Sequence, residues 1–138
     1  MIAQLAIQLT NNAYQANAKG DYKTAAEWCR RALTLTQDLP ETWFNLGVSE
    51  RGLGHRDAAL AALARAQKCC RGSPDALNSI GLQHLYLQSY EQAEACFRSA
   101  IRRNPDFALA HSNLGLLQAA KKNYVKAESC FRQGIALA

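Results

Sequence analysis

The chain has 138 residues, 49% of them hydrophobic, and a formal net charge of +5 at pH 7. This length suits a single domain, and this hydrophobic content excludes a disordered chain. No apolar run approaches the roughly 20 residues that a membrane-spanning helix needs, so we expect no membrane insertion. The apolar segment 1–9 lacks a basic leader and is interrupted by Gln4 and Gln8, which is typical of a first helix and not of a signal peptide.

One pattern of small and apolar residues recurs every 34 positions, with no insertion or deletion between its copies. Its phase predicts four repeats, at 6–39, 40–73, 74–107 and 108–138. In chain order the recurring residues are Leu9, Asn12, Ala13, Ala25, Cys29 and Ala32; Trp43, Leu46, Gly47, Ala59, Leu63 and Ala66; Leu77, Ile80, Gly81, Ala93, Phe97, Ala100 and Pro105; and His111, Leu114, Gly115, Ala127, Phe131 and Gly134.

The second repeat has clear helix boundaries. We predict a helix from about Glu41 to Leu53, with Pro40 in its first turn, where a missing N–H costs little. A turn at Gly54 and His55 then separates this helix from the next one along the chain.

The third repeat carries start and stop signals for two helices. Ser73 and Pro74 open the first helix, and Pro105 ends the second. Ser89 and Gln92 have the S-x-x-Q spacing of a capping box at the start of the second helix. The sequence therefore predicts a pair of helices in each repeat.

These residues resemble the tetratricopeptide repeat, a 34-residue helix-turn-helix unit with W-x2-L-G, then A-x3-F, then a late proline. The resemblance covers nearly the whole chain. It departs in the first copy at Asn12 and Ala13, where the family prefers leucine and glycine. It implies an all-α fold, a right-handed superhelical solenoid of antiparallel helix pairs, that forms one domain over 1–138.

Small residues recur at fixed places in the repeat. Gly47, Gly81 and Gly115 lie where two helices would have to approach closely. Alanines recur on the facing helix, at Ala25, Ala59, Ala93 and Ala127. We expect small residues to face small residues and to allow tight packing.

In tetratricopeptide arrays the first helices of the pairs line a concave groove, and the resemblance implies that the sixth position of each repeat points into it. Those positions are Asn11, Asn45, Ser79 and Asn113. An asparagine amide both donates and accepts hydrogen bonds, so such a row can pair with the backbone of an extended peptide. The row is similar to the asparagine ladder in the repeats of O-linked N-acetylglucosamine transferase. Ser79 interrupts it, and Asn78 is a partial substitute.

Apolar side chains near these asparagines would supply pockets between the polar rungs. The alternative is that the asparagines are polar residues on a solvated face and that some of the apolar residues pack within the array. The full set of predicted partner-binding residues is Asn11, Tyr14, Phe44, Asn45, Val48, Arg51, Asn78, Ser79, Leu82, Tyr86, Ser112, Asn113 and Leu116.

A second groove chemistry fails on charge. Co-chaperones with this repeat hold the C-terminal carboxylate of heat-shock chaperones through lysine, asparagine and arginine side chains. At the matching places this chain has Thr10, Tyr14, Asn45, Asp75 and Ser79, and only the asparagine fits. Because an acidic side chain repels a carboxylate, we exclude this partner.

No catalytic or cofactor motif occurs. Gly52 and Gly54 form a lone G-x-G at a turn, without the preceding strand and third glycine of a dinucleotide site. No spacing places a nucleophile beside a base, and no histidine pair suits a metal. We therefore expect no catalytic residue, no metal and no cofactor. His84 and His111 should pack, and His55 should be solvated in its turn.

Basic residues concentrate on the second helix of each repeat, where Arg30, Arg98 and Arg132 are equivalent. Glutamates interleave with them, and no aromatic ladder accompanies them as single-strand binding requires. We therefore expect a solvated outer face and no nucleic-acid partner, with an acidic protein or RNA on that face as the alternative.

Five cysteines, an odd number without C-x-x-C, do not form a disulfide framework. Packing accounts for those at equivalent repeat positions. Free thiols in this number favour a reducing compartment, the cytoplasm. The cysteines are Cys29, Cys69, Cys70, Cys96 and Cys130.

The sequence thus predicts a non-catalytic module that binds an extended or partly helical peptide in a concave groove. Two alternatives stay open. The chain could recruit substrates for a larger glycosyltransferase or other modifying enzyme. It could also be a self-associating scaffold, because segment 135–137 and the first helix, with Ile2, Leu5 and Leu9, present apolar surface that another molecule would cover.

Overall fold

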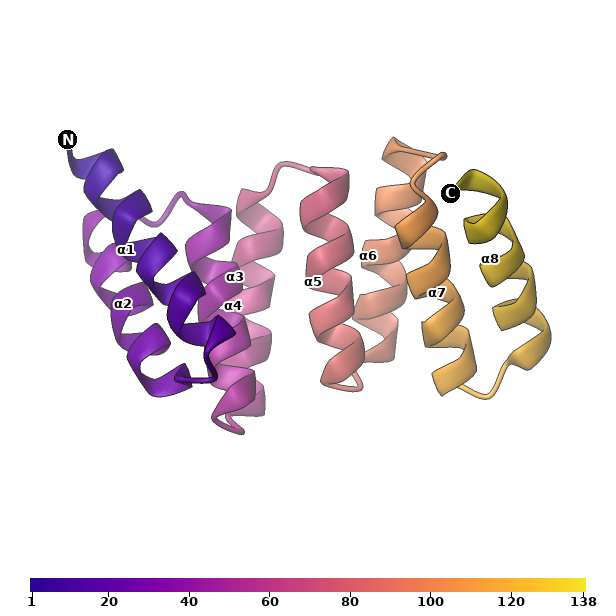
Figure 1. Cartoon of the computed structure of the whole chain (residues 1–138), viewed down its shortest axis with the longest axis horizontal. Coiled ribbons are helices and arrows are strands. Elements are labelled where there is room, and N and C mark those ends of the chain that lie inside the picture. Colours follow the sequence, from indigo (N-terminus) through magenta and orange to yellow (C-terminus); the bar gives the residue numbers. More distant parts are fainter. The chain divides into compact units, whose positions relative to one another are not determined.

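The computed structural model describes all 138 residues and contains eight α-helices and no strand (Figure 1). Consecutive helices run antiparallel as pairs joined by short turns. The predicted all-α fold of antiparallel helix pairs is confirmed. The helices are α1 (Ile2–Ala18), α2 (Tyr22–Leu35), α3 (Pro40–Gly52), α4 (Arg56–Cys69), α5 (Pro74–Tyr86), α6 (Tyr90–Arg103), α7 (Ala108–Ala120) and α8 (Tyr124–Leu137).

Local sequence explains where several helices begin. Pro40 and Pro74 occupy the first turns of α3 and α5, as predicted. Ser73 caps α5 by accepting a hydrogen bond from the Ala76 amide at 3.4 Å. Ser89 is the N-cap of α6, but its hydroxyl donates to Gln92 Oε1 at 2.5 Å and caps no main-chain amide. The capping box predicted there is therefore wrong in its hydrogen bonds, because the two side chains bond to each other.

The same turn joins the two helices of every pair. The residue two positions before the second helix has a positive φ and is Gly20 or Gly54 in the first two pairs, and Gln88 or Lys122 in the last two. The residue after it donates its amide to the carbonyl five positions earlier, as His55 does to Glu50 O at 2.8 Å. Glycine takes this conformation without steric cost. The last two turns show that the hydrogen bonds suffice to hold other residues there.

Two compact units make up the chain, residues 1–71 and residues 72–138. Each unit holds two helix pairs. In the first unit α3 packs against both α2 and α1, and in the second unit α7 packs against both α6 and α5. That the four pairs form a single domain stays a prediction.

Each unit has its own apolar core. The core of the first unit is built from small residues of α1 and α2 with two large partners, namely Ala13, Ala16, Ala25 and Cys29 with Trp28 and Leu46. The core of the second unit is richer in large side chains, namely Ala93, Phe97, Leu114 and Leu117 with Leu82, Leu85, Tyr90, Ile101 and Cys130.

The recurring glycines make room for large side chains, not only for small ones. A Cβ built at Gly81 would lie 2.7 Å from the Phe97 ring, and a Cβ at Gly115 would lie 2.7 Å from the Phe131 ring. At the equivalent Gly47 the nearest atoms belong to Leu63, at 3.0 Å. The prediction that small residues face small residues is therefore incomplete, because the glycine accommodates the bulky side chain of the partner helix.

This geometry predicts that Gly81→Ala destabilises the protein more than Gly47→Ala. Alanine is the better helix former by about 1 kcal/mol, whereas overpacking a rigid core costs about 1–3 kcal/mol. Phe97 is fully buried and its ring cannot retreat. We therefore expect a net loss at Gly81 and a nearly neutral change at Gly47, measured as free energies of unfolding in urea. Equal losses at both sites would show that ring packing is not the cause.

Candidate functional site

The predicted partner-binding residues all lie on the first helices of the pairs. Six of them belong to the first unit and seven to the second, and each group is described within its own unit. Those of the first unit are Asn11 and Tyr14 on α1 and Phe44, Asn45, Val48 and Arg51 on α3. Those of the second unit are Asn78, Ser79, Leu82 and Tyr86 on α5 and Ser112, Asn113 and Leu116 on α7.

In the first unit, Asn11 and Tyr14 are exposed, and the Tyr14 side chain keeps 64% of its surface. Asn45 is only 6% exposed. Phe44 and Val48 are half-buried. Exposed and half-buried apolar surface therefore borders a nearly buried amide on adjacent helices α1 and α3.

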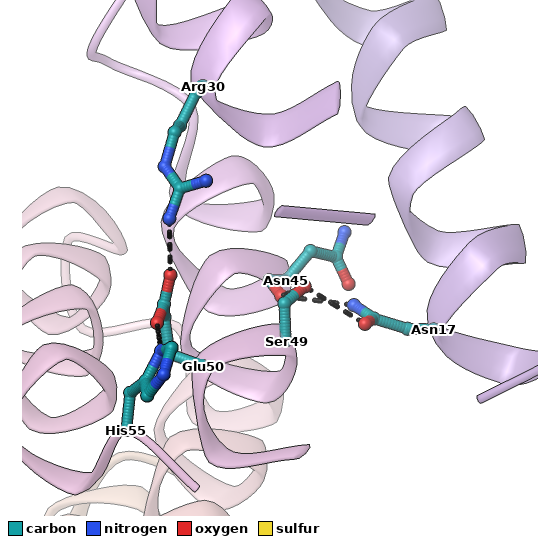
Figure 2. Close-up of polar contacts among 6 residues, drawn as sticks. All are labelled: Asn17, Arg30, Asn45, Ser49, Glu50 and His55. Carbon is teal, nitrogen blue, oxygen red and sulfur yellow. Dashed lines mark hydrogen bonds and ion pairs between the residues drawn. The ribbon is translucent and has the colours of Figure 1, made fainter. Parts of the chain in front are cut away.

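Hydrogen bonds tie α1 to α3 through the main chain of Asn45 (Figure 2). Asn17 Nδ2 donates to the Asn45 carbonyl at 3.0 Å. The Ser49 hydroxyl lies 2.8 Å from the same carbonyl and 2.9 Å from Asn17 Oδ1. The side-chain amide of Asn45 takes no part in these bonds. Among buried side-chain polar atoms only His84 Nδ1 lacks a partner and solvent, so the Asn45 amide reaches solvent.

Sequence reasoning missed Asn17 and Ser49. Both are small polar residues within helices, where such residues are disfavoured unless they have a partner. They lie 32 positions apart, two short of a full repeat. That near-repeat spacing is the signal that could have identified them as neighbours on adjacent helices.

In the second unit, two asparagine amides meet. Asn113 Nδ2 donates to Asn78 Oδ1 at 3.0 Å, and each residue is 4% exposed. This pairing uses one donor and one acceptor, and it leaves the oxygen of Asn113 and the nitrogen of Asn78 for other partners. Exposed Tyr86 and Leu116 keep 54% and 47% of their surface. Leu82, in contrast, packs against the core.

A buried carboxylate joins the two helix pairs of the first unit. Glu50 on α3 is 4% exposed. Arg30 Nη2 of α2 lies 2.7 Å from Glu50 Oε1, and His55 Nδ1 lies 2.7 Å from Glu50 Oε2 (Figure 2). The expectation that His55 is merely solvated is therefore wrong, because the imidazole, although 60% exposed, contacts a buried carboxylate.

The second unit uses amides at the same repeat positions. Gln118, two repeats after Glu50, donates to Glu94 Oε1 at 3.0 Å, and Asn123, two repeats after His55, donates to Gln118 Oε1 at 3.1 Å. Lys121 Nζ lies 4.0 Å from Glu94 Oε1. A position that holds a carboxylate in one repeat and an amide in another serves a structural junction. We therefore assign the His55 and Glu50 pair to packing, not to acid-base chemistry.

The two histidines predicted to pack have different surroundings. His111 Nε2 lies 2.9 Å from the Pro105 carbonyl. His84 is 3% exposed, and its Nδ1 has no hydrogen-bond partner. Burial lowers the pKa of His84 from its ordinary value of 6.5, because the charged imidazole loses its hydration.

The protein should therefore lose stability in mild acid through His84. Because the pKa of His84 is lower in the folded chain, the unfolded chain binds the proton first, so this stability is present above the unfolded pKa and is lost as the pH falls below it. We expect His84→Gln to reduce the difference in unfolding free energy between about pH 7.5 and about pH 5.5. Urea titrations at both pH values measure it, and an unchanged difference would contradict the assignment.

All five cysteines are free thiols. Cys29 is fully buried, and desolvation raises its pKa to about 12. Desolvation also raises the pKa of the half-buried Cys130. A thiol is nucleophilic only as the thiolate, so these two groups are unsuited to thiol chemistry. No group of three His, Cys, Asp or Glu side chains is placed to hold a metal ion.

Alkylation of the native protein at about pH 8 should distinguish the thiols. We expect Cys69, which is half-buried, to react first and Cys29 to react only after unfolding. Mass spectrometry of peptides from native and urea-unfolded samples gives the order. Rapid labelling of Cys29 in the native protein would show that the core of the first unit opens.

The basic outer residues are largely engaged with neighbours. Arg98 pairs with Glu94 at 3.7 Å and Arg132 pairs with Glu128 at 2.6 Å, both within one helix. The guanidinium of Arg65 lies 4.6 Å from the centroid of the Trp43 ring, which the arginine therefore covers. These contacts weaken the positive field and occupy the ring that a base would need for stacking.

Comparison with known proteins identifies the architecture. Residues 78–138 match the family model described as tetratricopeptide repeat. No curated protein matches the sequence. None of the eight helices combines the length and the apolar character needed to cross a membrane.

Solved structures extend the likeness to nearly the whole chain. MamA is 21% identical with a TM-score of 0.78, over 96% of this chain and 77% of that chain. YrrB, described as a tetratricopeptide-repeat protein with an unusual peptide-binding site, is 22% identical with a TM-score of 0.76, over 98% and 70%. TTC0263 of Thermus thermophilus, also a tetratricopeptide-repeat protein, is 25% identical with a TM-score of 0.77, over 96% and 74%. These likenesses show the fold.

Proposed function

Because the chain belongs to the tetratricopeptide-repeat family, whose fold serves protein-protein interaction, we propose that it is a non-catalytic module that binds an extended or partly helical peptide along its first helices. Asn45 in the first unit and Asn113 with Asn78 in the second unit would hold the peptide backbone. The proposal includes a cytoplasmic location, which the five free thiols favour.

The observation that carries this proposal is the state of the asparagine amides. The helix-to-helix hydrogen bonds at Asn45 use its main-chain carbonyl, so its amide keeps both donor and acceptor capacity. The bonded pair of Asn78 and Asn113 also keeps one donor group and one acceptor. A peptide unit presents one N–H and one C=O, so each site can pair with one peptide unit whatever the peptide's side chains are.

Apolar surface beside the amides supports binding of side chains as well. In the first unit the exposed Tyr14 and the half-buried Phe44 and Val48 flank Asn45 along the sequence and on the adjacent helix. Leu116 and Tyr86 have the corresponding role in the second unit. Aromatic residues give large contact area at low entropic cost. Specificity would come from these residues and affinity for the backbone from the amides.

Two alternatives make different predictions about the same molecule. A substrate-recruiting segment of a modifying enzyme would bind the peptide in the same way, and the natural reading frame would continue into a catalytic domain. A self-associating scaffold would change mass with concentration. Neither a chaperone carboxylate nor a nucleic acid fits the charges at the proposed surface, where Asp75 replaces a cation.

Selection from a random peptide display library tests the proposal. We expect peptides enriched on the wild type to lose at least about tenfold in affinity for the Asn45→Ala, Asn113→Ala variant, because two backbone contacts of about 1 kcal/mol each are lost. Isothermal titration with the enriched peptides measures the affinities. A matched variant of two exposed outer residues, Arg31→Ala with Arg102→Ala, should bind normally.

Circular dichroism must first show that both variants keep the wild-type helix content. Enriched peptides that bind both variants as tightly as the wild type would refute a role for the asparagines. Loss of binding only in the arginine variant would move the site to the outer helices.

A further inference from the structure

The last helix, α8, has one packed face and one bare face. Its packed face meets α7, where Phe131 covers Gly115 and Gly134 lies against Ser112. Figure 1 shows α8, in yellow, with α7 on one side only within the second unit. On the opposite face Tyr124, Val125 and Ile135 expose 66%, 85% and 75% of their surface.

The repeat shows that this bare face is a helix-packing face. In the first unit the same position as Arg132 is Arg30, which reaches Glu50 on α3. In the second unit the same position as Glu128 is Glu94, which accepts from Gln118 on α7. Ile101, equivalent to Ile135, packs against the core under α7. The residues of α8 are therefore of the kind that, elsewhere in this chain, contact a neighbouring helix.

The bare face also has a mirror order along the helix. Val125, Glu128, Arg132 and Ile135 follow one another at steps of three, four and three, which places them on one stripe. Read in either direction the stripe runs apolar, charged, charged, apolar, with opposite charges at its two central places. A shallow hollow lies along it, lined by Val125, Glu128, Ser129, Arg132, Gln133 and Ala136.

We propose that α8 is a self-complementary interface through which two copies of this chain pair, with their α8 helices antiparallel about a two-fold axis near residue 130. In this arrangement Val125 meets Ile135 of the second copy, and Glu128 meets Arg132 of the second copy. Each contact occurs twice, as a two-fold interface requires.

Charge complementarity selects the antiparallel copy over other occupants. Parallel, in-register α8 helices would oppose Glu128 to Glu128 and Arg132 to Arg132. The α1 helix of a second copy is also a poor match. At the positions where α3 and α7 pack on the preceding pair, α1 carries Gln8, Asn12 and Gln15. Head-to-tail stacking would moreover give open chains in place of a closed dimer.

The interface should be weak. One helix of 14 residues offers less than the roughly 1,600 Å² of a standard interface. Glu128 and Arg132 already pair at 2.6 Å within α8, with side chains 63% and 77% exposed, so in the dimer they form a ring of four alternating charges. Apolar contact by Val125, Ile135 and Tyr124 supplies most of the affinity, and the charges set the orientation. We expect a dissociation constant on the order of 10–100 μM.

Sedimentation equilibrium from about 1 μM to about 1 mM tests the dimer. The wild type should pass from 15.2 kDa to twice that mass. Glu128→Arg alone and Arg132→Glu alone should each weaken the dimer at least about tenfold, because each places like charges opposite one another. Arg102→Glu, an equal charge change on exposed α6, should leave it unchanged.

Mixing the two single variants gives the decisive readout. A Glu128→Arg chain pairs only with an Arg132→Glu chain, because both central contacts then have opposite charges, so the mixture should dimerise although neither variant does alone. The double variant, with both charges exchanged, should dimerise with itself. A monomeric wild type at about 1 mM, a dimer insensitive to either substitution, or a mixture that stays monomeric would each overturn the proposal. None of these outcomes bears on peptide binding by the asparagines.

Discussion

The close approach of the two helices within each pair is the constraint on which the remaining structure depends. A glycine on the first helix leaves space that Phe97 or Phe131 of the second helix fills, and a Cβ there would lie 2.7 Å from the ring. Because the large side chain points into its own pair, the outer surfaces of the pair are left for its neighbours. The spacing set by this contact therefore decides which residues can reach the adjacent pair.

Between adjacent pairs, polar side chains have a structural task that resembles a functional one. Glu50 with Arg30 and His55, and Gln118 with Glu94 and Asn123, occupy matching places and connect a second helix to the following first helix. Buried polar groups need such partners. The asparagine amides at Asn45 and Asn113 differ from these residues, because each retains hydrogen-bonding capacity after the helices are joined.

A repeat protein acts through the surfaces that its own repeats do not use. The first helices leave amides and apolar side chains for a peptide, whereas α8 leaves a face that elsewhere in the chain contacts a helix. These two surfaces are chemically distinct. One presents hydrogen bonds suited to a main chain, and the other presents apolar residues and paired charges suited to a second helix.

The 34-residue period by itself determined the eight helices, their pairing and the positions of the small residues, because local packing repeats when the residue pattern repeats. It also identified Asn45, Asn78 and Asn113 as candidates. Only the tertiary structure decided how these asparagines are used, that Asn17 and Ser49 join them, that Phe97 fills the space at Gly81, and that His55 contacts Glu50. Those contacts depend on the direction in which each side chain leaves its helix and on residues of a neighbouring pair, which the period does not specify.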